Sequence, residues 1–469
     1  MELKPNIVYI FADQMRAQAT GYAGDPNVQT PYLNKLSEES LNFSNAVSNC
    51  PICTPYRASL MSGQFPLTHG LFMNDLCLPD NGHSLGQELK AGGYNTAWIG
   101  KWHLDGHGRK SYIPPERRQG FDYWKVLECT HDYNDSRYYS GESEEPLTWE
   151  GYDVYSQTDD ALNYINSRNG KPFALFLSFG TPHDPYDSAP EALKALYPAE
   201  SLELRKNVAE HRRSQAREQL TGYYAHVTAI DSCVEKIDKK LKSLKIQDNT
   251  IFVFTSDHGD LLESHNLAVH PERGSRKQMP YDESVLVPFL LRYPAKYSSA
   301  GREITLPLCA PDIMPTLLSL AGIAVPGVVE GRNLTVLLDE AATDYLEDTV
   351  SQRDRLDADL KQGVLVANYH PFADWRTERG GKAYRGIRTR RYTYVRDLNG
   401  PWLLFDNRQD SFQLENLVNR EAYKEIQEQL DGELNLLLSN QQDNFESPEE
   451  LRKRWGYHVD DFEEIPYGD

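Results

Sequence analysis

The sequence predicts an α/β fold in which a large, mostly parallel or mixed β-sheet is sandwiched by helices, followed by a smaller C-terminal antiparallel sheet with a covering helix. Short apolar runs recur along the 469-residue chain, and helical stretches separate them. Strands that alternate with helices favour a mostly parallel sheet covered on both faces. The composition changes after about residue 365, so we expect a larger domain over residues 1–365 and a C-terminal subdomain over residues 366–469.

The expected strands of the large sheet are short apolar runs whose length suits buried strands. They cover residues 6–12, 96–100, 173–179, 250–255 and 285–292. The clearest helix covers about residues 208–244, where apolar residues recur at helical spacing and charges lie on the outer face. In the C-terminal part, residues 388–395 and 402–405 are expected strands, residues 421–438 a covering helix, and the acidic stretch from Glu446 onward a solvated tail.

The formal net charge of −20 argues against several functions. Such a field repels polyanions, so we expect no nucleic acid partner, and an anionic substrate would need a local basic pocket. No apolar run approaches the roughly 20 residues that span a bilayer, and we expect no membrane partner. No signal peptide is visible before the first strand, but a processed N-terminus would look the same. A periplasmic or secreted location and a cytoplasmic one therefore both stay open.

Polar side chains suited to chemistry follow four of the expected strands. They are Asp13 and Gln14, Lys101 and His103, His183, and Asp257 and His258. Ligands of open α/β sheets bind beyond the carboxyl ends of the strands, so we expect these groups to converge at one edge. The carboxylates of Asp13 and Asp257, the amide oxygen of Gln14 and the imidazole of His258 suit a divalent cation. Calcium is the first expectation, with manganese and magnesium as alternatives, while a helix N-cap is the plain alternative for Asp13.

The segment that begins at Cys53, with the sequence CTPYR, is the strongest single indication of a reaction. A proline two residues after the cysteine suits the first turn of a helix, whose N-terminus favours anions. Arg57 lies four residues on, along the same helix face. Cys50 and Cys53 also have CxxC spacing, which leaves zinc binding or thiol–disulfide chemistry as alternatives. The segment that begins at Cys50 lacks this pattern. Ile52 and Thr54 stand two and four residues after Cys50, where the proline and the arginine would be needed.

The longer segment CTPYRASLMSG resembles the signature of the formylglycine-dependent (type I) sulfatases of the alkaline phosphatase superfamily, in which the cysteine of C-x-P-x-R is oxidised to formylglycine. Tyr56 stands where that family usually has serine. FADQ, GKWH, TPHDPY and TSDHGD resemble further motifs of the family, with Gln14 where many members have aspartate and His258 where others often have asparagine. Lys277 is followed four residues later by Tyr281, and RGIRTRRYTYV and LFDNRQDSFQLENL resemble the family's C-terminal subdomain. The motifs follow the family's order over most of the chain.

This resemblance implies an alkaline phosphatase-like fold and hydrolysis of a sulfate ester, and it points to bacterial polysaccharide sulfatases. A hydrated aldehyde at position 53 would attack sulfur with one oxygen and later expel sulfate with the other. The implied cation ligands are Asp13, Gln14, the converted Cys53, Asp257 and His258. The implied catalytic residues are Cys53, Arg57, Lys101, His103, His183 and Lys277.

Each implied catalytic residue has an expected task. Arg57 and Lys101 would hold the diol and shield its charge. Lys277 and His183 would contact the sulfate and the leaving oxygen, with His183 as the general acid. His103 would orient or deprotonate the diol. The expected partners are a sulfated carbohydrate and a formylglycine-generating, or sulfatase-maturating, enzyme.

Two further interpretations stay open alongside the CxxC chemistry. A phosphonate monoester or phosphodiester hydrolase of the same superfamily can share the formylglycine and the Asp-Gln and Asp-His motifs, and a non-catalytic carbohydrate-binding homologue would keep the fold alone. We expect the substrate mouth in residues 105–151 and 370–385. There Trp375 would stack on sugar rings, and Arg376 and Arg379 would bind a uronate or a second sulfate.

Overall fold

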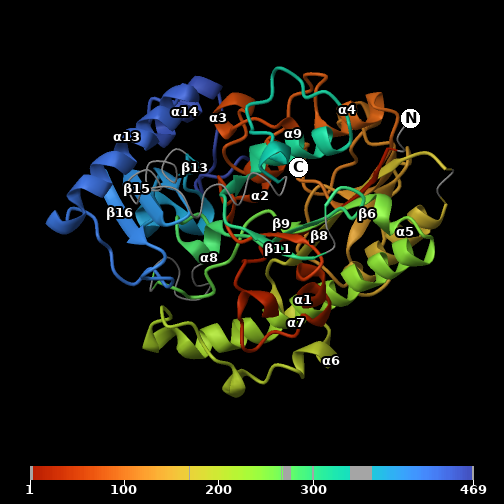
Figure 1. Ribbon diagram of the computed structural model, residues 1–469, viewed down its shortest axis with the longest axis horizontal. Coiled ribbons are helices and arrows are strands. Elements are labelled where there is room, and N and C mark those ends of the chain that lie inside the picture. Colours follow the sequence, from red (N-terminus) through yellow and green to blue (C-terminus); the bar gives the residue numbers. More distant parts are fainter. Residues whose placement is uncertain are drawn as a thin grey trace.

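The centre of the molecule is a ten-stranded mixed sheet with the strand order β11-β2-β10-β9-β1-β8-β4-β5-β6-β7. It is seen in a computed structural model that describes residues 4–167, 170–265, 267, 276–297, 300–338 and 362–466 (Figure 1). Its strands are β1 (Asn6–Asp13), β2 (Leu41–Phe43), β4 (Asn95–Lys101), β5 (Tyr123–Leu127), β6 (Arg137–Ser140), β7 (Leu147–Thr148), β8 (Phe173–Pro182), β9 (Thr250–Ser256), β10 (Phe289–Arg292) and β11 (Arg302–Ile304). The central strands β9, β1, β8, β4 and β5 run parallel to one another, which confirms the expected mostly parallel or mixed sheet.

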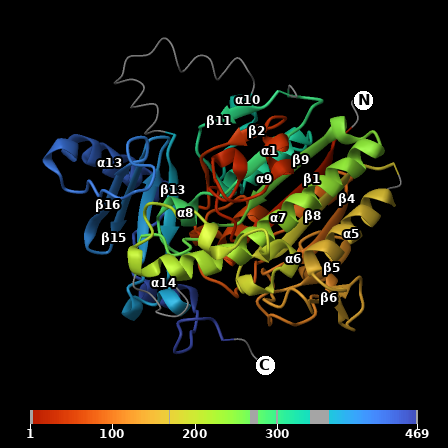
Figure 2. The ribbon, with the colours of Figure 1, turned by 90° about the horizontal axis from the view of Figure 1, so that it is seen from below.

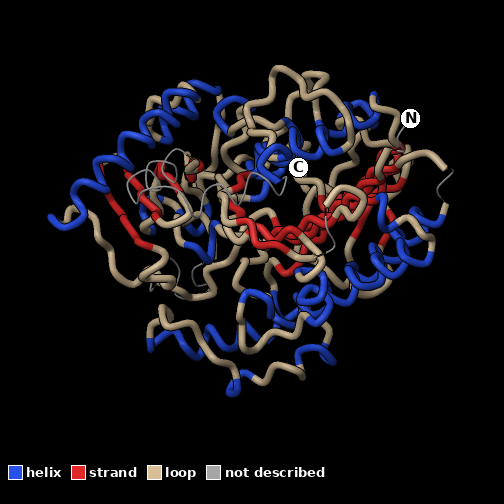
Figure 3. The backbone as a smooth tube through the Cα atoms, viewed as in Figure 1, coloured by secondary structure: helices blue, strands red, loops and turns tan. Residues whose placement is uncertain are grey.

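Helices cover both faces of this sheet (Figures 1 and 3). One face carries α1 (Pro31–Ser37), α5 (Asp153–Asn166) and α7 (Arg213–Ser243), and the other carries α2 (Cys53–Ser62), α4 (Leu85–Ala91) and α9 (Ala310–Leu320). Side chains alternate along β1, so that Val8 and Ile10 enter the core beside α7, whereas Tyr9 and Phe11 enter the core beside α2. Burial on both faces explains why the strand is a continuous apolar run, as is usual for parallel sheets.

Several short elements connect these layers. They are α3 (Pro66–His69), α6 (Glu191–Lys194), α8 (Asp282–Val285), α10 (Thr335–Leu338), and the two-stranded parallel pair β3 (Ala46–Val47) and β12 (Leu308–Cys309). The helix expected over residues 208–244 is α7, which begins at Arg213 after a single 3-10 turn. In the described part of the chain, no helix combines the length and the apolar character needed to cross a membrane.

A second, four-stranded antiparallel sheet forms the C-terminal part, in the order β13-β14-β15-β16. Its strands are β13 (Val364–Asn368), β14 (Tyr384–Arg388), β15 (Tyr392–Asp397) and β16 (Gly400–Asp406). The expected covering helix is α13 (Lys424–Asn440), which buries Leu430, Leu434 and Leu438. Figure 2 shows this sheet and α13 to the left of the large sheet. The domain division after residue 365 would fall inside β13, and it stays a prediction.

Two of the expected strands differ from the structure. The run 285–292 is a strand only from Phe289, because α8 occupies its beginning and Pro288, which lacks a backbone N–H, directly precedes β10. The run 388–395 contains the end of β14, a turn and the start of β15. The Oγ1 of Thr389 accepts the backbone N–H groups of Arg391 at 3.1 Å and Tyr392 at 2.9 Å, and this local bonding reverses the chain.

The expectation of a solvated tail from Glu446 onward is wrong. The helix α14 (Pro448–Trp455) begins there, with the Ser447 side chain and Glu450 forming a capping box. Leu451 is buried, and Trp455 packs against the main core. Of the acidic residues that suggested a tail, Glu449 and Glu450 lie in the first turn of this helix, where negative charge stabilises the helix dipole.

Candidate active site

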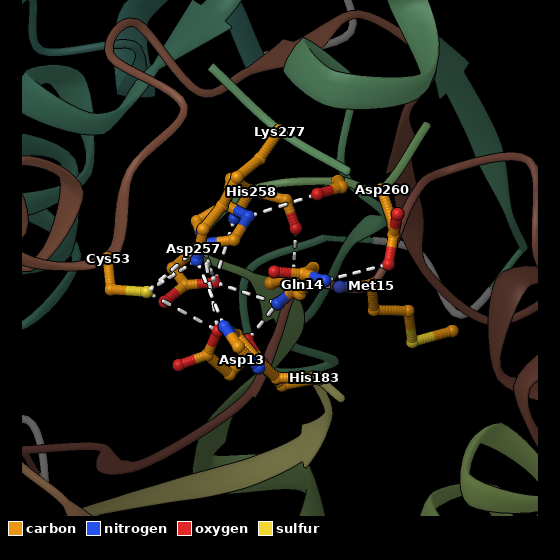
Figure 4. Close-up of polar contacts among 12 residues, drawn as sticks. Asp13, Gln14, Met15, Cys53, His183, Asp257, His258, Asp260 and Lys277 are labelled. Carbon is orange, nitrogen blue, oxygen red and sulfur yellow. Dashed lines mark hydrogen bonds and ion pairs between the residues drawn. The ribbon is translucent and has the colours of Figure 1, made fainter. Parts of the chain in front are cut away.

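Four potential cation ligands meet at the carboxyl edge of the large sheet (Figure 4). Asp13 is the last residue of β1, Asp257 and His258 directly follow β9, and Cys53 is the first residue of α2. One ligand atom from each of these four buried residues lies within 4.8 Å of the others. They meet because β1 and β9 are parallel neighbours in register, with Ala12 opposite Ser256. The expected convergence of strand ends is thus present in the structure.

Gln14 has an amide oxygen that is also a potential cation ligand. Its backbone has a φ of 70°, and its N–H donates to Oδ1 of Asp257 at 3.0 Å. Its side-chain Nε2 donates to Oδ2 of Asp260 at 2.7 Å, while its buried Oε1 has no hydrogen-bond partner among the described residues. Leaving a buried acceptor unsatisfied costs free energy. Together with two carboxylates and an imidazole, this orphaned oxygen fits a divalent cation with mainly oxygen ligands.

Two buried cations balance the charge of the carboxylates. The Arg57 guanidinium lies 3.2 Å from Oδ2 of Asp13 and 3.1 Å from Oδ2 of Asp257. The ammonium of Lys101 lies 2.6 Å from Oδ2 of Asp13. Burial alone would raise the pKa of Asp13, but Lys101 and other nearby cations hold it well below its usual range. Burial and the neighbouring Asp13 raise the pKa of Asp257, because two carboxylates share the site.

Cys53 is the thiol that faces this cluster. Its Sγ lies 3.2 Å from Nε2 of His258, 3.4 Å from Nζ of Lys277 and 3.5 Å from Oδ1 of Asp13. Burial opposes ionisation of the thiol, yet Lys101, Lys277 and His258 lower the pKa of Cys53 well below its usual range.

Cys50 has a different environment. It lies in the hydrophobic core, burial raises the pKa of its thiol, and neither it nor Cys53 forms a disulfide. Tyr56, which stands in place of the family's usual serine, is also buried in that core.

His183 and Lys277 lie beside the cluster and contact each other. The Nζ of Lys277 lies 3.0 Å from Nε2 of His183, and Nδ1 of His183 lies 3.0 Å from the carbonyl oxygen of Asp184. Burial and then Lys277 lower the pKa of His183. The ring of His131 stacks on that of His183 with centroids 4.6 Å apart and fixes its plane.

His103 lies beside the cluster in an acidic setting. Its Nε2 lies 2.6 Å from Oδ1 of Asp75, whose other oxygen lies 2.7 Å from Nη2 of Arg109. Burial opposes protonation, but the electrostatic field of Cys129 and the hydrogen bond with Asp75 raise the pKa of His103 to about 9. The imidazole is therefore cationic at neutral pH, which suits orienting an oxygen better than removing its proton.

A cavity of about 490 Å³ opens above Cys53. Its floor includes Cys53, Lys101, His103, His183 and Lys277, and its walls include Arg109, His131, Trp375, Arg379, Phe462 and Glu464. Both segments expected at the substrate mouth therefore contribute to it. Sequence reasoning missed Phe462 and Glu464, which lie in the stretch expected to be a tail. It also missed Asp75, in a loop without a motif, and Asp260, which the TSDHGD motif could have indicated.

Comparisons with known proteins agree with this geometry. A sulfatase family model matches residues 5–323, and a model of the C-terminal part of N-sulphoglucosamine sulphohydrolase matches residues 275–440. The ulvan-active sulfatase of Formosa agariphila is 43% identical over 459 residues, covering 97% of this chain and 85% of that protein. The endo-4-O-sulfatase of Bacteroides thetaiotaomicron is 31% identical over 512 residues, covering 97% and 95%.

A solved structure from work on the metabolism of multiple glycosaminoglycans by Bacteroides thetaiotaomicron has a TM-score of 0.80 and 29% identity, covering 97% of this chain and all of that one. The fold is therefore that of the alkaline phosphatase-like hydrolases. The chain belongs to the sulfatase family, and it is a sulfuric ester hydrolase.

Proposed function

We propose that the protein removes sulfate from a sulfated carbohydrate, with formylglycine at position 53 as the nucleophile and a divalent cation beside it. The observation that carries this proposal is the position of Cys53: the cysteine that heads C-x-P-x-R faces the cation-binding cluster, whereas Cys50 is enclosed in the core. The names of the ulvan-active sulfatase and the endo-4-O-sulfatase favour a polysaccharide or oligosaccharide substrate.

Asp13, Gln14, Asp257, His258 and the converted Cys53 would hold the cation. Calcium is the first choice because oxygen ligands predominate, and manganese and magnesium remain alternatives. When bound, the cation supplies Lewis acidity that lowers the pKa of a hydroxyl and offsets the charge of the sulfate group. The nitrogen Nδ1 of His258 lies 3.0 Å from the carbonyl oxygen of Gly259, which orients Nε2 towards position 53.

The reaction follows from the groups around position 53. One hydroxyl of the hydrated aldehyde attacks sulfur, the bond from sulfur to the sugar oxygen breaks, and that oxygen takes up a proton. The second hydroxyl then loses its proton, the bond from Cβ to the sulfated oxygen breaks, and sulfate leaves as the aldehyde reforms. Water rehydrates the aldehyde for the next cycle.

The side chains divide these tasks. Arg57 and Lys101 neutralise the negative charge around the diol, and Arg57 is locked because its guanidinium also donates to Oγ of Ser178 at 2.8 Å. Lys277 and His183 contact the sulfate and the leaving oxygen. The ammonium of Lys277 is within hydrogen-bond distance of Nε2 of His183, so a proton can pass to the imidazole that serves as the general acid.

Conversion of Cys53 requires a formylglycine-generating or sulfatase-maturating enzyme as a partner. The test is release of sulfate from a panel of defined sulfated oligosaccharides by the matured, calcium-loaded enzyme, with mass analysis of the peptide that contains position 53. We expect desulfation only in preparations that carry the aldehyde. A higher kcat/KM for aryl phosphonate monoesters or phosphodiesters than for every sulfate ester would instead establish the phosphorus hydrolase alternative.

A further inference from the structure

The C-terminal segment forms a fixed wall of the cavity. After α14, Tyr457, Val459 and Ile465 pack against the main core. The carbonyl oxygen of Phe462 accepts the backbone N–H of Ala373 at 2.9 Å.

A tight turn then presents the segment to the cavity. The carboxylate of Asp460 accepts the backbone N–H groups of Phe462 at 2.8 Å and Glu464 at 3.0 Å, and its own N–H donates to the carbonyl oxygen of Glu464 at 2.9 Å. These bonds set the positions of two side chains before any ligand arrives, and such preorganisation lowers the cost of binding.

Phe462 offers an open aromatic surface at this wall. It lines the cavity with 54% of its surface exposed, although its size would favour burial. The guanidinium of Arg376 lies 4.9 Å from the ring centroid and covers one face. The remaining ring surface is therefore free for another partner. A flat apolar ring beside polar groups suits the CH-bearing face of a sugar.

Glu464 supplies an acceptor beside this ring. It lines the same cavity, and among the described residues the hydrogen bonds of Glu464 involve its backbone and not its carboxylate. Arg109 attracts this carboxylate electrostatically, but its guanidinium is bound to Asp75. Asp374 lies in the same wall, where Arg379 balances its charge. A sugar hydroxyl, which is a neutral donor, fits this carboxylate.

We propose that Phe462 and Glu464 bind the sugar ring that carries the sulfate, with Phe462 stacking on its apolar face and Glu464 accepting hydrogen bonds from its hydroxyls. This inference rests on the proposed function and specifies its substrate: the ring edge that meets this wall carries free hydroxyls. Arg379, which the sequence suggested for a second anion, pairs with Asp374 at 3.3 Å.

The test measures kcat and KM for desulfation of the best oligosaccharide by the matured holoenzyme, together with the inhibition constant of inorganic sulfate. Phe462→Ala and Glu464→Ala should each raise KM about three- to tenfold, as expected for one stacking contact or one charged hydrogen bond, and leave kcat within about twofold. Inorganic sulfate contacts only the floor, so its inhibition constant should stay unchanged. Phe462→Trp and Glu464→Gln, which keep a ring and an acceptor, should recover most of the affinity.

Asp461→Asn, an exposed neighbour in the same turn, is the matched control and should behave as the wild type. Unchanged KM in both alanine variants of an active enzyme would overturn this inference and leave the proposed function standing. A parallel rise in KM and in the sulfate inhibition constant would also overturn it. The substitutions would then weaken sulfate binding by the residues of the floor, without a contact between the wall and the sugar. A fully matured wild-type enzyme that desulfates no saccharide would overturn both proposals.

Discussion

Individual residues of the site differ in how far the sequence could define them. Asp13 ends β1, and Asp257 and His258 directly follow β9, so their meeting at one edge can be predicted from a parallel sheet alone. Their spacing gives no indication of Asp75, which contacts His103 from a loop 28 residues earlier in the chain. The same holds for the stack of His131 on His183. Residues placed by regular elements could be predicted, whereas residues placed by loop packing could not.

Gln14 provides a test of the cation site at the level of one atom. We predict that Gln14→Leu weakens calcium binding about tenfold or more, because it removes the orphaned Oε1 while keeping a side chain of similar size. Gln18→Leu is the matched control, since Oε1 of Gln18 is also buried without a hydrogen-bond partner among the described residues, and Gln18 is not in the proposed ligand set. The measurement is calcium titration calorimetry on the metal-free protein. Equal affinities of both variants would remove Gln14 from the ligand set.

His183 provides a test of proton donation. A sugar alkoxide is far more basic than an activated phenolate, so it needs a proton as it leaves. We predict that His183→Ala lowers kcat/KM for a sugar sulfate by about 10²-fold or more and for an activated aryl sulfate clearly less. Comparing the two substrates cancels shared effects on folding and maturation. Equal losses would mean that His183 binds sulfate without donating a proton, and the acid would then be sought at Lys277.

Among the helices and strands, the central strands could be predicted because both of their faces are buried. The predictions were wrong where local hydrogen bonds turn or fold the chain. The run 388–395 contains several residues of high β-propensity, but Thr389 turns the chain within it. The stretch after Glu446 has the composition of a tail, yet a capping box and a few apolar contacts are enough to fold it onto the core. Composition predicts average exposure, and it cannot show which acidic residues cap a helix.

The junction of β1, β9 and α2 also makes a prediction about stability. Asp13 and Asp257 repel each other, and a cation that binds only the folded protein stabilises it by about 2.7 kcal/mol at a concentration 100 times its Kd. We predict that a chelator lowers the melting temperature and abolishes activity, and that calcium restores both. Thermal melts of the wild type and of Gln14→Leu, recorded with and without chelator, are the measurement. An unchanged melt together with unchanged activity would exclude the cation from the mechanism.

At the scale of the whole molecule, a protein with a net charge of −20 concentrates cations where an anionic ester would react. Lys101, Lys277, Arg57 and the cationic His103 lie around position 53, so the local field opposes the global one. From the sequence, a local basic pocket could be inferred only because an anionic substrate would require one. The residues that form it come from distant segments, so only the fold shows where it lies. Likeness to sulfatases extends across 97% of the chain, which agrees with a site assembled from both parts of the molecule.

We infer that the aldehyde formed from Cys53 is the nucleophile. The most direct measurement is the rate of sulfate release set against the fraction of aldehyde at position 53, in the wild type, Cys50→Ala and Cys53→Ala, each produced with a maturation enzyme. The rate should rise in proportion to the aldehyde fraction, Cys50→Ala should keep at least about a tenth of the activity, and Cys53→Ala should have none. Sulfate release by Cys53→Ala at the wild-type rate, or equal losses from both substitutions, would contradict the account.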